Sequence, residues 1–177
     1  MSLAPLGFSE FFAQQAAERP DLAPARVTAE GQDLFWLAGC KAELGAMTGR
    51  LRRNERPVVG DWVLVADDPD RATIHQILQR RTVFARRAAG TSGDTQLLAV
   101  NVDVVFIVTS ANQDLNARRL ERYLTQVRSG GATPVMVVNK LDLVADPDAV
   151  ITAVREVDAH VDVVGTRARE GQEKRAG

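Results

Sequence analysis

Pro134-Val135-Met136-Val137-Val138 is an apolar run that leads directly into Asn139-Lys140-Leu141-Asp142. A short apolar run rich in β-branched residues predicts a buried strand. In open sheets of parallel strands, ligands bind at the carboxyl ends of the strands, and Asn139 comes at this end. The stretch therefore predicts an α/β domain with a binding site directly after the strand.

The motif Asn139-Lys140-Leu141-Asp142 carries the functional groups that guanine recognition requires. The Asp142 carboxylate can accept hydrogen bonds from N1–H and from the exocyclic amino group, a donor pair that adenine lacks. Asn139 can meet the N7 and O6 edge, and the stem of Lys140 can lie along the ring face. Charge-assisted bonds of this kind contribute about 1.5–3 kcal/mol each. A chance tetrapeptide is the alternative, and the buried strand before it favours a guanine site.

Alternating strands and helices around this stretch support the α/β prediction. We expect strands at 102–108, 134–138 and 161–164, and helices at 116–128 and about 147–157. Asp146 followed by Pro147 is typical of a helix start, a cap with proline at the first helical position. The order β-α-β-α-β predicts a right-handed parallel unit. Because residues 102–108 are almost continuously apolar, we expect that strand to be covered on both faces.

The sequence changes character between residue 25 and about residue 87, where short strands alternate with turn residues. We expect strands at 26–29, 33–37, 58–65, 72–78 and 82–85. Five short strands with polar and basic connections predict a small antiparallel barrel of the OB-fold type, which often binds oligonucleotides. An SH3-like barrel would produce much the same pattern.

The net charge of the whole chain does not indicate nucleic-acid binding, but the charge of one segment does. The whole chain has a net charge of −1, with 45% hydrophobic and 25% charged residues, which is ordinary for a globular protein. Residues 41–90, however, carry ten basic and six acidic residues, a local net of +4. Arginines that contact phosphates would give salt-dependent binding with little sequence selectivity, although a solvated charged face is the alternative. The candidate RNA-binding residues are Arg50, Arg52, Arg53, Arg56, Arg80 and Arg81.

Several kinds of protein and site are excluded or disfavoured. Cys40 is the only cysteine, so no intrachain disulfide or cysteine-clustered zinc site can form. No apolar run reaches the length of a bilayer span, and no basic region followed by an apolar stretch opens the chain. We therefore expect a cytoplasmic protein without a membrane partner.

His75 and His160 are far apart in sequence and do not suggest a metal pair. Residues 162–165 fit Asp-x-x-Gly, a motif for metal and γ-phosphate, but we interpret them as the end of a strand.

The chain lacks a phosphate-binding loop. Such a loop reads Gly-x-x-x-x-Gly-Lys-Ser/Thr, and its backbone N–H groups and lysine bind the phosphates. The three lysines, Lys41, Lys140 and Lys174, follow cysteine, asparagine and glutamate. The base-reading half of a nucleotide site is thus present without the half that performs chemistry, and we predict no catalytic residues in this chain.

A barrel followed by Asn-Lys-x-Asp, with no phosphate loop before it, resembles the circularly permuted, ribosome-small-subunit-dependent GTPases of the YjeQ/EngC type. The matching stretches are residues 58–63, 96–103, 116–124 and 134–143, and together they cover about residues 25–145. The resemblance implies a five-stranded OB-fold barrel followed by a partial, circularly permuted, parallel α/β GTPase domain. We expect a lead-in at 1–24, the barrel at 25–87, a linker at 88–95 and the partial GTPase domain at 96–177.

The same resemblance implies ligands and partners. It implies weak GTP or GDP binding, with Mg and Zn expected only for the complete family architecture, and it implies the 30S ribosomal subunit and 16S rRNA as partners. The nucleotide-binding residues that it implies are Asn139, Lys140, Asp142, Thr166 and Ala168. Ala168 would back onto the base, in a stretch where Arg167 stands in place of the family's serine.

Three functions remain open. The first is a GTPase of small-subunit maturation. The second is a truncated, non-hydrolysing RNA-binding module, and the third is an inactive fragment or the product of a truncated gene. A sheet of three parallel strands would also leave edges that can pair with other chains, so we expect a tendency to self-associate.

Overall fold

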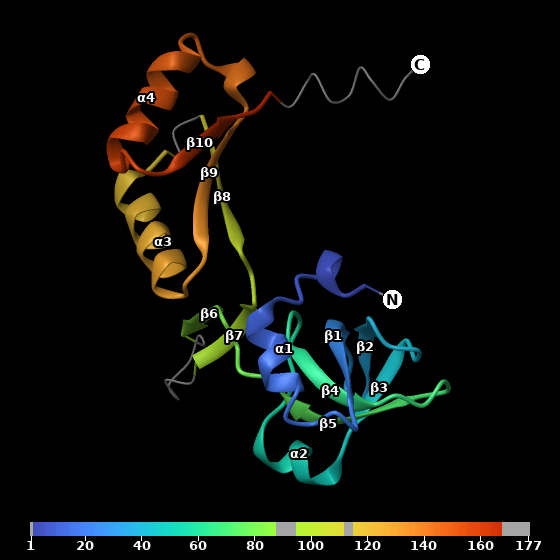
Figure 1. The fold of residues 1–177 in the computed structure, drawn as a ribbon. Coiled ribbons are helices and arrows are strands. Elements are labelled where there is room, and N and C mark those ends of the chain that lie inside the picture. Colours follow the sequence, from blue (N-terminus) through green and yellow to red (C-terminus); the bar gives the residue numbers. More distant parts are fainter. Residues whose placement is uncertain (1, 88–94, 112–114, 168–177) are drawn as a thin grey trace, which may run out of the picture. The chain divides into compact units, whose positions relative to one another are not determined.

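The computed structural model describes residues 2–87, 95–111 and 115–167 (Figure 1). The chain divides into two compact units, Met1–Val102 and Asp103–Gly177. Most of the linker predicted at 88–95 lies outside the described residues, and β7, which opens the range that we predict for the second domain, lies in the first unit. Among the described residues, no helix is long and apolar enough to cross a membrane.

The first unit contains a closed barrel of five strands: β1 Ala23–Glu30, β2 Phe35–Ala38, β3 Leu44–Met47, β4 Trp62–Ala66 and β5 Ala72–Ile77. Their order around the barrel is β1-β2-β3-β5-β4, and β1 closes on β4. β3 runs parallel to β5, and the other neighbouring pairs are antiparallel. The predicted five-stranded OB-fold barrel is therefore confirmed, in preference to the SH3-like alternative.

The barrel differs from the prediction in which segments form it. Leu44–Met47 forms β3, which we did not predict, while most of the predicted strand 82–85 lies in β6 (Val83–Arg87), outside the barrel. β6 pairs instead with β7 (Thr95–Val100). Glycine weakens the sequence signal of a strand, yet Gly45 is what β3 needs, because a Cβ there would lie 2.6 Å from Leu37 Cδ1.

The start of β4 is also later than predicted. The expected strand 58–65 begins only at Trp62, because the chain turns at Gly60. Gly60 has a φ of 96°, and a Cβ there would lie 2.2 Å from the carbonyl oxygen of Val100. This position therefore requires glycine on two grounds, backbone conformation and space.

β4 is buried on both of its faces. Val63 and Val65 point into the barrel, whose interior also contains Val27, Phe35, Leu37, Ala72 and Ile74. Trp62 and Leu64 form a second cluster with Phe12 of α1 (Glu10–Ala16) and with Leu78. The ring of Trp62 meets that of Phe8 edge-on at 4.7 Å between centroids. The lead-in thus contributes a helix that covers the outside of the barrel, although the Ser9 hydroxyl at its start makes no capping hydrogen bond.

The second unit is a parallel sheet in the order β10-β9-β8, formed by β8 Val104–Ser110, β9 Thr133–Asn139 and β10 Asp162–Gly165. α3 (Ala117–Ser129) and α4 (Pro147–Val157) provide the crossovers, as predicted. Asn116 caps α3 by accepting from Arg119 N at 3.1 Å. Asp146 caps α4 by accepting from Ala149 N at 3.0 Å, with Pro147 at its first position.

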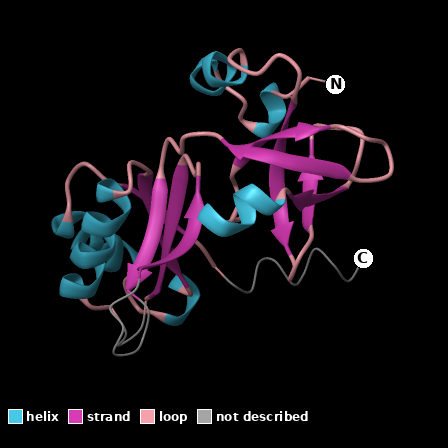
Figure 2. Ribbon diagram, turned by 90° about the horizontal axis from the view of Figure 1, so that it is seen from below, coloured by secondary structure: helices cyan, strands magenta, loops and turns pink. Residues whose placement is uncertain are grey.

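The prediction that β8 is covered on both faces is wrong for the described residues. Ile107 and Thr109 are buried, whereas Phe106 and Val108 are 64% and 66% exposed. Both crossovers step across the sheet in the same direction, so right-handed connections place α3 and α4 on the same face. Figure 2 shows both helices on one side of the strands. Within the described residues of the second unit, no helix lies on the other face of the sheet.

Candidate functional site

The predicted base-reading residues lie where β9 and β10 end side by side. Val138 and Gly165 are register partners in the parallel pair. After the strands, Thr166 N donates to Val138 O at 2.8 Å, and Leu141 N donates to Thr166 O at 3.2 Å. These two hydrogen bonds join the two strand ends into one loop cluster at the carboxyl edge of the sheet, where ligands of such sheets bind.

Asn139 has a defined orientation within this cluster. Its side-chain oxygen accepts from Lys140 N at 2.7 Å and from the Thr166 hydroxyl at 3.0 Å. A backbone N–H can only donate, so the side-chain atom that faces it must be the oxygen. Nδ2 therefore points away from both partners, and its two N–H groups have no acceptor among the described residues. A free amide donor at this place suits the O6 and N7 acceptors of guanine.

Lys140 and Leu141 determine how the next residue is presented. Lys140 has φ 63° and ψ 34°, a left-handed conformation that is uncommon outside glycine and often found at functional sites. It turns the chain into a short 3-10 helix, η2 (Leu141–Leu143), whose Leu141 is buried. Leu141 packs tightly on Gly165, where a Cβ would lie 2.5 Å from Leu141 Cδ1. The buried leucine anchors the turn and leaves Asp142 exposed at the surface.

The structure thus brings four of the five predicted nucleotide-binding residues to one edge. Asn139, Lys140 and Thr166 are joined by hydrogen bonds, and Asp142 lies in the adjoining turn. Ala168 lies outside the described residues. Sequence reasoning missed the contribution of β8: Ala111 N donates to the Asn139 carbonyl oxygen at 2.9 Å. The register of the parallel strands pairs Ser110 with Asn139, and this register is known only from the structure.

Arg80, one of the six predicted RNA-binding arginines, is engaged inside the barrel unit. Its Nε and Nη2 donate to the two oxygens of Asp61, both at 2.8 Å, and its Nη1 lies 3.1 Å from Glu55 Oε1. Asp61 is fully buried and also accepts from Val58 N at 2.9 Å. The hydrogen bonds to Asp61 raise the pKa of Arg80 above its ordinary value, against the opposing effect of burial. A buried carboxylate requires such a partner.

Arg56 is engaged on the hairpin between β1 and β2. Its Nη1 donates to Gln32 O at 2.9 Å, and its Nη2 donates to Gly31 O. The guanidinium also lies 5.1 Å from the ring centroid of Phe35, within the range of a cation–π contact. With the ion pair between Arg56 Nε and Glu30 at 3.9 Å, four interactions of one side chain tie the segment after α2 to that hairpin.

The three arginines of α2 are more available to a ligand. α2 (Gly49–Asn54) carries Arg50, Arg52 and Arg53, all exposed. Arg52 makes an exposed ion pair with Asp33 at 3.2 Å. Arg50 and Arg53 make no hydrogen bond or ion pair within the part of the chain that the structure describes. Arg81 is exposed, and its backbone N–H donates to Asn101 Oδ1 at 2.8 Å. Of the predicted set, the arginines of α2 present the clearest cationic surface.

Metal binding finds no support in the described ranges, which contain no group of three or more histidine, cysteine, aspartate or glutamate side chains able to hold an ion.

The sequence model of the RsgA GTPase family matches residues 77–176, more than half of the chain. The small ribosomal subunit biogenesis GTPase RsgA of Opitutus terrae is 39% identical over 189 residues, which cover 97% of this chain and 52% of that protein. The protein of the same name from Methanosarcina acetivorans is 47% identical over 121 residues, which cover 67% and 33%. The chain thus spans about a third to a half of the length of these curated relatives.

Two solved structures share the fold. YjeQ from Thermotoga maritima superposes with a TM-score of 0.66 at 21% identity, over 87% of this chain and 56% of that one. YloQ, described as a circularly permuted GTPase, superposes with a TM-score of 0.65 at 21% identity, over 84% and 52%. The succession of a closed barrel and a parallel α/β unit is therefore that of the circularly permuted GTPases.

Proposed function

Because the chain belongs to the RsgA GTPase family, we propose that it recognises the guanine base of GTP or GDP with Asn139, Lys140 and Asp142. The observation that carries this proposal is the orientation of Asn139, whose oxygen is held by Lys140 N and Thr166. Its free amide N–H groups then face outward as donors for O6 and N7, while the Asp142 carboxylate accepts from N1–H and the amino group. The base supplies the donors and acceptors that complement this edge.

The phosphate end of the nucleotide has no counterpart in these residues. Fixing the phosphates requires a backbone nest, a lysine and a Ser/Thr ligand for Mg²⁺, and the 177 residues contain no phosphate-loop motif. We assign to this chain the base-reading part of the reaction cycle. The word GTPase in the relatives' names applies to the whole proteins. This chain spans about a third to a half of their length.

Replacing Asp142 by asparagine tests the guanine assignment. Asp142→Asn exchanges one acceptor oxygen for an NH₂ donor, which faces a donor of guanine. Xanthine carries a carbonyl at that position, so the variant should prefer xanthine nucleotide, whereas the unaltered chain prefers guanine nucleotide. Titration of fluorescent GDP and XDP analogues measures both preferences. Asp148→Asn, the same change at an exposed aspartate of α4, is the control, and equal preferences in all three proteins would refute the assignment.

A second proposed function is binding of 30S subunits and 16S rRNA by the barrel unit, in the cytoplasm. The name of the relatives, small ribosomal subunit biogenesis GTPase, and the exposed arginines of α2 support it. It would not require nucleotide turnover, so it fits a binding module as well as a complete enzyme.

The arginine surface is tested by the salt dependence of RNA binding. Arg52→Ala/Arg53→Ala should weaken binding and reduce the slope of log affinity against log salt by about 1.4, if each side chain neutralises one phosphate of a single strand. Arg118→Ala/Arg122→Ala removes two exposed arginines of α3 and should leave both quantities unchanged. An unaltered slope in the α2 variant would contradict the proposal that the arginines of α2 bind RNA.

A further inference from the structure

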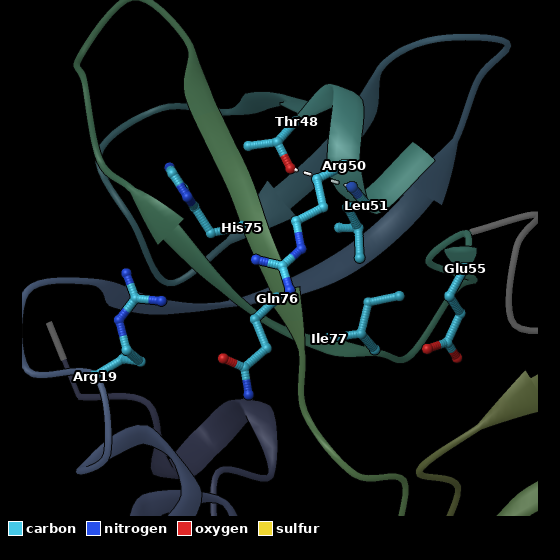
Figure 3. A pocket seen from close by; sticks show the side chains of 8 residues that line it. All are labelled: Arg19, Thr48, Arg50, Leu51, Glu55, His75, Gln76 and Ile77. Carbon is cyan, nitrogen blue, oxygen red and sulfur yellow. Dashed lines mark hydrogen bonds between the residues drawn. The ribbon is translucent and has the colours of Figure 1, made fainter. Parts of the chain in front are cut away.

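A pocket of about 610 Å³ opens on the barrel unit between α2, β5 and the turn that follows α1. Figure 3 shows the side chains around it, with Arg50 reaching from α2 toward the middle of the group. The residues that the argument uses are Arg19, Arg50, Leu51, His75, Gln76 and Ile77. Pockets of this volume are in the range that holds small organic ligands.

One cation of the pocket, Arg50, is unpaired among the described residues, and a second, Arg19, keeps one terminal nitrogen free. Arg50 has no hydrogen bond or ion pair among the described residues. Arg19 uses Nε and Nη2 on Asp21, at 2.9 and 2.8 Å, so Nη1 remains without a partner in the same described part. The one carboxylate in the lining, Glu55, already faces Arg80 at 3.1 Å. The pocket therefore offers the guanidinium of Arg50 and the Nη1 group of Arg19, whose charge is balanced by Asp21, while its own carboxylate, Glu55, is paired with Arg80.

The rest of the lining suits a planar ligand that has both polar and apolar groups. Leu51 and Ile77 are half-buried aliphatic side chains, and His75 is an exposed ring on β5. Gln76 carries both a donor and an acceptor, and no hydrogen bond of its side chain occurs among the described residues. A planar heterocycle can stack on an imidazole or a guanidinium, and its edge can pair with an amide.

We propose that this pocket holds one unpaired nucleotide of the bound RNA, with its phosphate on Arg50 and Arg19 and its base against His75, Leu51 and Ile77. Gln76 hydrogen-bonds to the edge of the base. The inference rests on the proposed RNA-binding function and extends it, because it adds Arg19, His75 and Gln76 to the surface. A base in a duplex is paired and stacked, so only an unpaired base can enter.

The test compares a short single-stranded RNA of mixed sequence with the same strand annealed to its complement, by fluorescence anisotropy with the full chain. His75→Ala should weaken single-strand binding about fivefold or more, the loss expected for one stacked base, and leave duplex binding unchanged. His75→Phe keeps a ring and should restore the affinity. His160→Ala, a change at the other histidine, which is exposed in the second unit, should have no effect.

The failures of the two proposals give different results. If the unaltered chain binds neither RNA form, the RNA-binding function fails and this inference fails with it. If Arg52→Ala/Arg53→Ala weakens both forms while His75→Ala and Gln76→Ala bind the single strand like the unaltered chain, the RNA surface stands and the pocket assignment is overturned. Competition by a free mononucleotide as strong as by the oligonucleotide would also overturn it, because the pocket would then be a mononucleotide site.

Discussion

Two donors hold the side-chain oxygen of Asn139, and one of them, Thr166, directly follows β10 and lies 27 residues further along the chain. Lys140 N is part of the same turn and would be present in any chain with this motif. The Thr166 hydroxyl is an addition from the residue after β10, and it restricts rotation of the amide. A binding group that is held in its working orientation before the ligand arrives loses less entropy on binding.

At the residue scale, we predict that Thr166→Val weakens guanine-nucleotide binding. The change keeps the branched shape and removes the hydroxyl, so Asn139 loses a hydrogen bond of about 0.5–1.5 kcal/mol. The affinity for a fluorescent GDP analogue should fall about two- to tenfold. Thr133→Val, at an exposed threonine that begins β9, should bind like the unaltered chain. An unchanged affinity of Thr166→Val would show that Thr166 does not position Asn139.

At the scale of elements, α3 and α4 are joined near their carboxyl ends. Arg128 in the last turn of α3 forms an ion pair with Asp158, the residue that follows α4. Asp158 also accepts from His160 N at 2.9 Å. The hydrogen bond from Arg128, followed by that from His160 N, lowers the pKa of Asp158 below its ordinary value. The pair therefore links two helices that pack on the same face of the sheet.

This pair should make a small, pH-dependent contribution to the stability of the second unit. A carboxylate whose pKa is lowered by folding stabilises the fold above its unfolded pKa, about 3.9, and loses this effect as pH falls through the folded pKa. Asp158→Asn should reduce amide-exchange protection of α3 and α4 slightly at pH 7, because Arg128 is exposed and ion pairs with an exposed partner contribute little. The difference from the unaltered chain should shrink below about pH 4. Asp162→Asn, at an exposed aspartate of β10, is the control, and a pH-independent difference would contradict the assignment.

At the scale of the whole molecule, the two units differ in how completely they are enclosed. The barrel closes on itself, and both faces of β4 are buried. The described helices of the second unit lie on one face of its sheet, and Val104, Phe106, Val108 and Val164 are exposed on the other face or at its edge. Parallel sheets are normally covered on both sides. The guanine edge thus belongs to a sheet that is half enclosed in the described residues.

We predict that this chain by itself does not hydrolyse GTP, with or without 30S subunits. None of its three lysines follows a glycine, and no phosphate-loop motif occurs in the 177 residues. Nothing then holds the β- and γ-phosphates in line with a water molecule, and the charge that develops on the leaving oxygen meets no fixed cation. Phosphate release by the purified chain should equal the background. Turnover above background that disappears in Asp142→Ala would contradict the prediction, and turnover that remains in that variant would indicate a contaminating enzyme.

Short-range features of this protein could be predicted from the sequence. The strand before Asn139, the capped helix after Asp146 and four of the five barrel strands follow from hydrophobic spacing and from residues a few positions apart. The base-reading motif is contiguous, so its chemistry is also visible without a structure. These features depend on neighbouring residues, whose interactions are the same wherever the segment lies in the fold.

The tertiary structure alone decided which segments and side chains meet across long separations. Gly45 concealed β3, because glycine lowers strand propensity while allowing the close approach that barrel closure needs. In the sequence, Arg80 does not differ from the neighbouring arginines. Only the structure shows that it pairs with the buried Asp61, which lies 19 residues away. Likewise, β8 has the composition of a strand covered on both faces, but the direction of the two crossovers determines where the helices lie. Composition records how apolar a segment is, whereas burial depends on what the rest of the fold places against it.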